Sequence, residues 1–265
     1  MISSNLKAIA KRSRFIHSSY KIIRDIHDLP PKKLLNVGEL RAVFQVLPNT
    51  MLPLPRLFDA YGAIVTANHE QLAGDIVECG VWNGGCVGLM ALANMRHPGP
   101  KRKFHLFDSF EGLPQPSSSD ADMISGFNES NPGGKLRDDG QTELVSIGAC
   151  VGLPEKKVEE FLVEHLGLPR DNFVFHVGWF QQTIPGTLSS LDKIAVLRLD
   201  GDYYESTKVC LDGLYDHVVK DGFIIIDDYG TFQGCKKAVD EFLISNDIKP
   251  EIHYSDSDCI YFRKP

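Results

Sequence analysis

Several features that would place this chain in a specialised class of protein are missing from its sequence. No apolar run approaches the ~20 residues that span a bilayer, and the basic N-terminus lacks the continuous apolar segment and cleavage site of a secretory signal. The six cysteines include no CxxC pair, which disfavours a zinc site and a disulfide framework. We therefore expect a cytoplasmic protein with no membrane partner, whose cysteines are small apolar side chains in a reducing compartment.

Positive charge is also scarce. Lys and Arg number 28 against 35 Asp and Glu, so the net charge is -7, which argues against a nucleic-acid partner. A hydrophobic content of 43% and a charged content of 24% are those of an ordinary globular protein. With 265 residues the chain can bury a large core, and one α/β domain with an elaboration fits this length.

Two short apolar runs with a helical segment between them dominate residues 194–230. The runs IAVLRLD and FIIID have the character of buried strands, and residues 204–220 repeat apolar side chains at helical spacing. Asp221 and Gly222 supply the expected turn into the second strand. Such a crossover makes both strands parallel, so their carboxyl ends meet at the edge where open α/β sheets bind ligands. The expected buried stripe of the helix is Val209, Leu211, Leu214, Tyr215, Val218 and Val219.

Both of these strand ends carry paired acids. Asp200 and Asp202 follow the first strand, and Asp227 and Asp228 follow the second. Two ionised carboxylates about 4 Å apart repel by roughly 4 kcal/mol at an effective dielectric of about 20, so some are protonated, turned away or gathered round a cation. Because every donor is a hard oxygen, Mg²⁺ or a similar divalent cation is the natural ligand. The structural alternative is that these residues only close strands and cap helices.

A glycine-rich turn follows an earlier predicted strand. Residues 75–79, DIVEC, run into GVWNGG and then a helix over residues 86–95. Such a turn lets backbone approach a ligand closely and presents N–H groups at a helix start, although its spacing departs from the GxGxxG of nicotinamide enzymes. A second strand over residues 104–107 ends at Asp108, the position where Rossmann-like folds hold ribose hydroxyls. Together with the acids, these features indicate an adenosine-type cofactor across the strand ends.

The middle of the chain contains its longest irregular tract, residues 112–152. A tract of this length beside the expected ribose acid predicts a lid over the active site. Lys135 and Arg137 within it are candidates for substrate contact or are solvated surface charges. A helix over residues 155–166 and a strand over residues 172–177 follow, and Trp179 after that strand either covers a planar ring or belongs to the core.

The C-terminal segments complete an alternating order of strands and helices. A helix over residues 233–245 precedes two strands over residues 251–254 and 259–263, which a polar hairpin turn joins. The predicted fold is a Rossmann-like α/β fold with a seven-stranded, mostly parallel sheet and a C-terminal β-hairpin, which is typical of class I methyltransferases.

The first 70 residues are helical in character and contain no strand signal. An apolar stripe within residues 6–26 is flanked by basic side chains, so this segment lies on a membrane surface or, as we favour, packs on its own domain or a second subunit. We expect residues 1–70 to form a helical arm or cap, with one further helix over residues 57–71, and residues 71–265 to form the catalytic domain. The apolar arm favours a homodimer or larger homo-oligomer.

Five motifs resemble, in their order, those of the macrocin O-methyltransferase family. They are ECGVWNGG, FDSFEGLP, VGWFQQTIP, LRLDGDYYEST and FIIIDDYG, and the resemblance runs from about Leu72 to the C-terminus. Members of that family methylate sugar hydroxyls of macrolide and aminocoumarin antibiotics. The resemblance therefore implies a metal-dependent O-methyltransferase that takes S-adenosylmethionine as cofactor and a small-molecule glycoside or saccharide as acceptor.

The resemblance also implies roles for individual residues. The divalent metal site of the family falls on Asp202, Asp227 and Asp228, and its general base falls on Asp200. The cofactor-binding positions, including those of the glycine-rich turn, are Glu78, Gly80, Trp82, Gly84, Asp108, Ser109, Gly178, Trp179 and Phe180.

The expected reaction is a direct in-line transfer of the methyl group, for which the enzyme supplies alignment and a nucleophile. Mg²⁺ would lower the pKa of a sugar hydroxyl, and Asp200 would take its proton. Three alternatives remain open from the residues. They are a methyltransferase for a catechol or another non-sugar diol, a nucleotide-sugar glycosyltransferase that uses the Asp-x-Asp pattern, and a non-enzymatic cofactor-binding or scaffolding protein.

Overall fold

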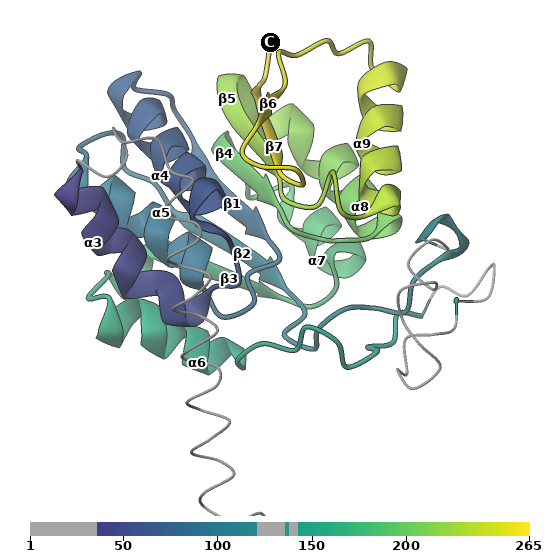
Figure 1. Cartoon of the computed structure of the whole chain (residues 1–265), viewed down its shortest axis with the longest axis horizontal. Coiled ribbons are helices and arrows are strands. Elements are labelled where there is room, and N and C mark those ends of the chain that lie inside the picture. The colour runs from purple at the N-terminus through teal and green to yellow at the C-terminus, as the bar shows by residue number, and fades with distance from the viewer. Residues whose placement is uncertain (1–35, 121–135, 138–142) are drawn as a thin grey trace, which may run out of the picture.

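The computed structural model describes residues 36–120, 136–137 and 143–265 (Figure 1). The basic segment over residues 6–26 and Lys135 lie outside these described residues. The described N-terminal part forms helix α3, Val37–Val46, a short 3-10 turn, Leu47–Asn49, and helix α4, Leu54–His69. Helix α4 begins before the predicted position 57 because Pro55 lies in its first turn, where a missing N–H costs nothing.

The described residues build one seven-stranded sheet in the order β3-β2-β1-β4-β5-β7-β6. Strands β1 to β5 are parallel, and β7 runs antiparallel to both β5 and β6. The predicted seven-stranded sheet with a terminal hairpin is therefore confirmed. The strands are β1, Asp75–Cys79, β2, Phe104–Asp108, β3, Phe173–Val177, β4, Ile194–Leu199, β5, Val218–Ile226, β6, His253–Tyr254, and β7, Ile260–Arg263.

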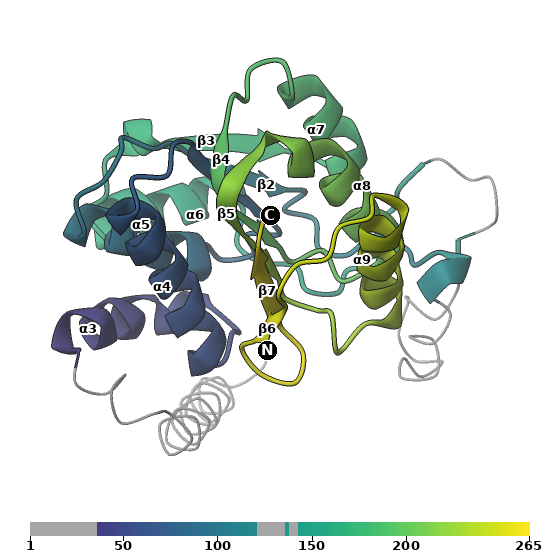
Figure 2. The ribbon, with the colours of Figure 1, turned by 90° about the horizontal axis from the view of Figure 1, so that it is seen from above.

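Helices cover both faces of this sheet (Figures 1 and 2). One face carries α3, α4, α5, Gly85–Arg96, and α6, Glu155–Glu160, which continues as a π-helical turn, Phe161–His165. The other face carries α7, Phe180–Thr187, α8, Tyr204–Leu214, and α9, Gln233–Ser245. Because both faces are covered, the central strands are mostly apolar and their side chains alternate between two cores. On β4, for example, Val196 belongs to the core on the α4 side and Leu197 to the core on the α8 side.

The largest difference from the predicted elements lies between β4 and β5. Helix α8 ends at Leu214, a 3-10 turn covers Tyr215–His217, and Val218 and Val219 begin β5 instead of extending the helix. Asp221, with φ of 62°, lies inside β5, where its N–H donates to the carbonyl of Lys264 at 2.8 Å. The β-branched pair favours a strand, and the extra residues are accommodated as an irregularity in the pairing of β4 with β5.

Candidate active site

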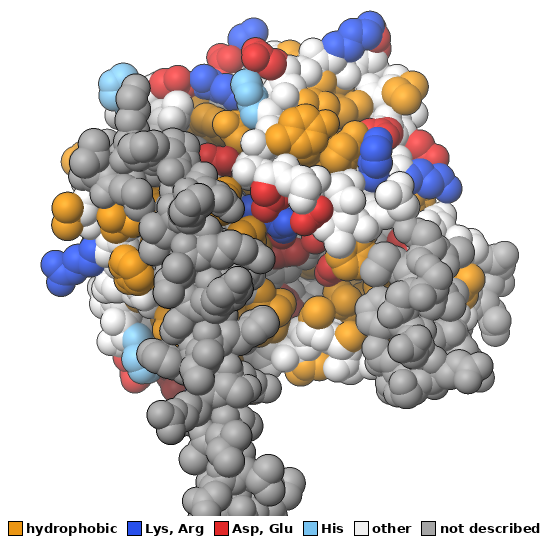
Figure 3. Space-filling model, viewed as in Figure 1, with side chains coloured by type: hydrophobic (Ala, Val, Ile, Leu, Met, Phe, Trp, Pro, Cys, Tyr) orange, Lys and Arg blue, Asp and Glu red, His pale blue; other side chains and the backbone are white. Residues whose placement is uncertain are grey.

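A cavity opens at the carboxyl ends of the parallel strands. It is lined by residues that follow β1 to β5 and by the N-terminal segment over residues 49–53, and it holds about 1200 Å³, its open mouth included. Figure 3 shows acidic side chains gathered around a basic one in the hollow of this face.

All the predicted site residues except Gly84 line this cavity. They are Glu78, Gly80, Trp82, Asp108, Ser109, Gly178, Trp179, Phe180, Asp200, Asp202, Asp227 and Asp228. Gly84, with φ of 79°, instead faces α6, and a Cβ there would lie 2.7 Å from Val158 Cγ1. Gly84 therefore allows α6 to pack on the glycine-rich turn and does not border the cavity.

Asp108 organises the glycine-rich turn. Its Oδ2 accepts hydrogen bonds from the backbone N–H groups of Val81 at 2.7 Å and Trp82 at 2.9 Å, and its Oδ1 accepts one from Phe110 at 2.7 Å. A carboxylate offers about four lone-pair sites, so Oδ1 keeps one acceptor position for a ligand hydroxyl. The side chain therefore shapes the turn and still presents an oxygen to the cavity.

The other predicted cofactor residues surround this carboxylate. The Gly80 N–H donates to the carbonyl of Phe107 and the Gly178 N–H donates to that of Asp108, both at 2.9 Å, which ties three strand ends together. Gly80 also has no room for a side chain, because a Cβ would lie 1.9 Å from the carbonyl oxygen of Asp200. Ser109 Oγ donates to the carbonyl of Gly112 at 3.2 Å.

Glu78 is a buried acid with an oxygen to spare. Its side chain is 1% exposed, and Oε1 accepts a hydrogen bond from Arg198 Nη1 at 2.9 Å. Oε2 is buried and has no hydrogen-bond partner among the described residues, and the thiol of Cys86, a weak donor, interacts with the same carboxyl group. Burial raises the pKa of Glu78 to about 7 although the Arg198 charge opposes this shift. An unsatisfied buried carboxylate oxygen on a cavity wall suits a cationic or N–H-bearing ligand.

Three aspartates bring their carboxylates together beside this part of the cavity. One oxygen from each of Asp200, Asp202 and Asp228 lies within 4.8 Å of the other two. The Asp202 backbone, with φ of 57°, adopts the left-handed conformation that Asp tolerates better than most residues, and its N–H donates to Asp228 Oδ2 at 3.2 Å. Three hard oxygen donors at this spacing can hold a divalent cation.

The electrostatics of the three aspartates favour a bound positive charge. Burial, together with the nearby Asp227 and against the opposing charge of Arg198, raises the pKa of Asp200 to about 6. Burial and the neighbouring carboxylates raise the pKa of Asp202 and of Asp228 well above the usual range. These carboxyl groups thus hold protons more tightly than exposed ones, and a cation among them would replace those protons.

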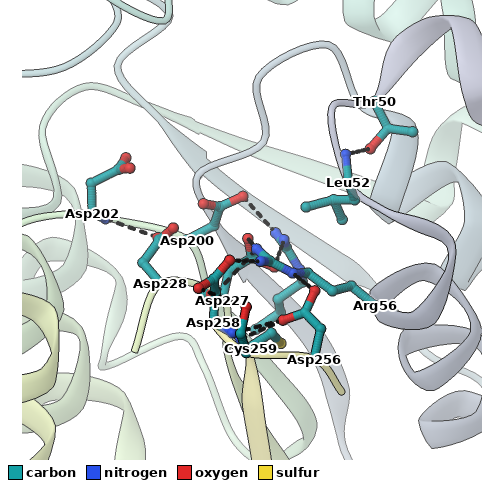
Figure 4. A network of polar contacts seen from close by, with 12 residues as sticks. Thr50, Leu52, Arg56, Asp200, Asp202, Asp227, Asp228, Asp256, Asp258 and Cys259 are labelled. Carbon is teal, nitrogen blue, oxygen red and sulfur yellow. Dashed lines mark hydrogen bonds and ion pairs between the residues drawn. The ribbon is translucent and has the colours of Figure 1, made fainter. Parts of the chain in front are cut away.

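Asp227 occupies a different environment (Figure 4). Its Oδ1 accepts a hydrogen bond from Arg198 Nη2 at 2.6 Å, and its Oδ2 accepts one from Arg56 Nη1 at 2.7 Å. The resemblance places Asp227 among the metal ligands and Asp200 as the base, whereas the geometry groups Asp200 with Asp202 and Asp228 and holds Asp227 between two arginines.

Sequence reasoning missed both of these arginines. Arg198 is 2% exposed and bonds Glu78, Asp200 and Asp227 at once. Arg198 could have been found in the sequence as a basic residue inside the apolar run IAVLRLD. A charged side chain in a buried strand is costly unless it is paired, so its presence there indicates acidic partners nearby. Arg56 occupies an ordinary position on a helix, and nothing local distinguishes it.

Parts of the predicted lid border the cavity. Gly112, Leu113, Pro114, Cys150 and Gly152 are among the lining residues. Arg137, a candidate for substrate contact, forms an ion pair with Glu205 on α8 and is not among the lining residues. The other candidate, Lys135, lies outside the described residues. Closure of this tract over the site stays a prediction.

Two compositional predictions can be compared with the structure. All six cysteines are free thiols, and all but Cys150 are buried, as expected for small apolar side chains. Within the part of the chain that the structure describes, no helix is both long enough and apolar enough to span a bilayer.

The fold and the site define a class I, S-adenosylmethionine-dependent O-methyltransferase. A solved structure of the O-methyltransferase NovP superimposes with a TM-score of 0.69 at 30% identity and covers 82% of each chain. The family described as macrocin O-methyltransferase (TylF) matches residues 38–264. The chain belongs to this family and is an O-methyltransferase, which decides against the glycosyltransferase and scaffolding alternatives.

Two curated relatives are about a third identical to the chain over the residues that align. It is 32% identical to demethyldecarbamoylnovobiocin O-methyltransferase of Streptomyces niveus over 82% of this chain and 76% of that protein. It is 31% identical to 8-demethyl-8-(2,3-dimethoxy-alpha-L-rhamnosyl)-tetracenomycin-C 4'-O-methyltransferase of Streptomyces olivaceus over 81% of this chain and 75% of that protein.

Proposed function

We propose that this O-methyltransferase transfers the methyl group of S-adenosylmethionine to a sugar hydroxyl of a glycosylated small molecule, with the help of a divalent cation. The observation that carries the proposal is one cavity bordered both by the turn that Asp108 organises and by the three aspartates. The names of the relatives support this class of acceptor, since one relative is named for the methylation of a rhamnosyl-bearing tetracenomycin.

The residues of the cavity fit S-adenosylmethionine. Asp108 keeps an acceptor position for a ribose hydroxyl, and the buried Glu78 Oε2 offers an acceptor for a polar N–H group of the cofactor. Trp179 and Phe180, at the start of α7, add aromatic surface to the same wall. The sulfonium makes the methyl group electrophilic, so the protein has to align it with a nucleophilic oxygen.

The donor set of the three aspartates fits a hard divalent cation such as Mg²⁺. Asp200, Asp202 and Asp228 would hold it, while Asp227 supports the group from its place between the arginines. A bound cation lowers the pKa of a hydroxyl that it contacts. Asp200 is our candidate for the group that accepts the hydroxyl proton, because it lines the cavity and lies beside the other carboxylates that would hold the cation.

We further propose the organisation expected from the sequence. Residues 1–70 form a helical extension, residues 71–265 form the catalytic domain with a lid near residues 112–152, and the protein works as a homodimer or larger homo-oligomer in the cytoplasm. The location of α3 and α4 on the same core as α5 supports a close association of the extension with the catalytic domain.

A binding assay and an activity assay test this proposal together. We expect S-adenosylhomocysteine to bind in calorimetry, and we expect methyl transfer to aminocoumarin, macrolide or rhamnosyl glycosides that lack a sugar methyl group. EDTA should abolish turnover and added Mg²⁺ should restore it, while cofactor binding persists. Transfer to catechol but to no glycoside would overturn the acceptor class, and full activity in EDTA would overturn the role of the cation.

A further inference from the structure

A guanidinium group from outside the sheet reaches the edge of the site. Arg56 lies in the first turn of α4, and its side chain, 11% exposed, lies between Asp227 and the turn that joins β6 to β7 (Figure 4). Arg56 Nη1 donates to Asp227 Oδ2 at 2.7 Å and to the Asp227 carbonyl oxygen at 3.2 Å. Nε donates to Asp256 Oδ2 at 2.6 Å, and Nη2 donates to Asp258 Oδ2 at 2.9 Å.

The β6–β7 turn is itself attached to the segment after β5. Asp256 Oδ1 accepts hydrogen bonds from the N–H groups of Asp258 at 2.9 Å and Cys259 at 2.8 Å, which gives the turn its shape. The Gly230 N–H donates to the Asp258 carbonyl oxygen at 2.8 Å, and a Cβ at Gly230 would lie 2.1 Å from the Ser257 carbonyl oxygen. Arg56 therefore holds the end of β5 both directly and through this turn.

Arg56 and Arg198 together leave Asp227 one orientation. Each carboxylate oxygen of Asp227 is bonded by a different guanidinium group, and such charge-assisted bonds are strong and directional. Asp228, the next residue, turns toward Asp202, as Figure 4 shows. The position of Asp228 among the three aspartates thus depends on where the end of β5 is held.

We propose that Arg56 is a positioning residue, which fixes Asp227 and the end of β5 so that Asp228 joins Asp200 and Asp202 in the cation-binding group. This inference rests on the proposed function only in assigning a cation to those carboxylates. It goes beyond that function because it assigns a role at the site to a helix of the N-terminal part of the chain.

Charge and geometry make opposite predictions for Arg56, which allows a sharp test. If Arg56 acted only by its charge, its removal would strengthen the binding of a cation nearby. If it acts by position, its removal weakens that binding even though a positive charge is lost. Arg56→Lys separates the two, because lysine keeps the charge but loses the planar fork of donors.

The chain offers a matched control in Arg263. This residue on β7 donates from Nη1 to Glu70 Oε1 at 3.1 Å, just after α4, and from Nε to the Asp221 carbonyl oxygen at 2.8 Å. Arg263 thus connects α4 to the same hairpin without lining the cavity. Arg263→Lys weakens a helix-to-hairpin link of the same kind and leaves Asp227 untouched.

The experiment uses the full chain and two readouts. Mn²⁺ binding in the presence of S-adenosylhomocysteine is followed by the electron paramagnetic resonance of free Mn²⁺, and hydrogen exchange is measured for the peptide that contains residues 226–230. In Arg56→Lys and Arg56→Gln we expect about tenfold weaker Mn²⁺ binding, as for loss of a residue that orients metal ligands. We also expect faster exchange in that peptide and unchanged affinity for S-adenosylhomocysteine.

The result that overturns the proposal is equally definite. Three outcomes would show that Arg56 acts only through its charge or as a structural link. They are wild-type Mn²⁺ affinity and hydrogen exchange in Arg56→Lys, tighter Mn²⁺ binding in Arg56→Gln, and equal losses of Mn²⁺ affinity in Arg263→Lys. If Arg56→Gln does not fold, Arg56→Lys alone decides. If the wild type binds no Mn²⁺, the cation in the proposed function is refuted, and the exchange data still decide whether Arg56 fixes the strand end.

Discussion

The buried Arg198 at this site is stabilised by the acidic side chains that surround it. Arg198 is 2% exposed on a central strand and would be costly there without partners, yet Glu78, Asp200 and Asp227 each accept a hydrogen bond from it. One guanidinium group thus connects an acid of the cofactor part of the cavity with the acids of the cation-binding part. The acids still outnumber the arginines, which is why a cation or protons must complete the site.

Asp200→Asn tests the role of this aspartate as proton acceptor. Asparagine keeps the size of the side chain but cannot take a proton, so turnover should fall by about 10²–10⁴-fold, the usual contribution of a general base. The affinity for S-adenosylhomocysteine should stay within about twofold, because Asp200 is not among its proposed ligands. Steady-state kinetics and calorimetry measure the two effects.

The control for this variant is Asp212→Asn. Asp212 is a half-exposed residue of α8 that pairs with Lys208 and does not line the cavity. Undiminished turnover in Asp200→Asn would remove it as the base. Because Asp200 is also a proposed cation ligand, Asp200→Asn should weaken Mn²⁺ binding, so turnover is compared at saturating Mg²⁺, and an unchanged Mn²⁺ affinity would remove Asp200 from the cation-binding group.

At the scale of elements, a chain of polar side chains joins three neighbouring strands and a helix. Asp75 Oδ2 contacts His105 Nε2 at 3.2 Å, His105 Nδ1 contacts His176 Nε2 at 3.0 Å, and Thr187 Oγ1 of α7 lies 3.3 Å from His176 Nδ1. The His176 ring also stacks on Phe107, with centroids 4.1 Å apart. The edge strand β3 is thus attached to β2 by side chains as well as by its backbone ladder.

His176, within this chain of side chains, makes the free energy of unfolding depend on pH in mild acid. Burial, with a further contribution from His105, lowers the pKa of His176 to about 4, from about 6.5 in an unfolded chain. The unfolded state therefore takes up a proton at a higher pH than the folded state does. The stability associated with His176 is fully present above pH ~6.5 and is lost as the pH falls toward ~4.

His176→Gln should reduce this pH dependence. Glutamine does not titrate, so the free energy of unfolding of this variant should fall less steeply between pH 6.5 and 4 than that of the wild type. Urea unfolding at a series of pH values measures the slope. Above pH 7 the two curves should run parallel, which serves as the internal control, and equal slopes below pH 6.5 would contradict the assignment to His176.

At the scale of the whole molecule, two cores on opposite faces of the sheet hold the strand ends in register. The core on the α4 side includes side chains from α3, α4, α5 and the π-helical turn, so helices of the N-terminal part contribute to it directly. The other core lies under α7, α8 and α9. Because the cavity lies at one edge of the shared sheet, both cores support its walls.

Leu57→Ala tests how much α4 contributes to this assembly. Leu57 is fully buried in the first core, and removing its branched side chain leaves a cavity, so the free energy of unfolding should fall by about 2–5 kcal/mol. Urea unfolding at pH 7 measures the change. Ile244→Ala on α9, where the side chain is 79% exposed, should change it by less than about 0.5 kcal/mol. A small effect at Leu57 would show that α4 is only loosely attached.

Local pattern and chain order account for the sheet and for most of the cavity lining. Apolar runs of strand length, separated by helical periodicity, require parallel crossovers, and parallel strands bring their carboxyl ends to one edge. That rule alone places Glu78, Asp108, Asp200 and Asp228 around one cavity. Local pattern does not fix the boundary between the predicted helix and the next strand. Periodicity assigns Val218 and Val219 to the helix, but they begin β5, because an apolar pair at that place fits a strand equally well.

The partners of each charge were decided by tertiary packing. Arg56 and Asp227 are 171 residues apart in the chain, and they meet only because α4 packs against β4 and β5. The separation of Asp227 from the other three aspartates has the same origin, as does the use of Gly84 to accommodate α6. Periodicity specifies which face a side chain occupies, but a hydrogen bond requires two atoms within about 3 Å, and only the packed fold places atoms from distant segments that closely.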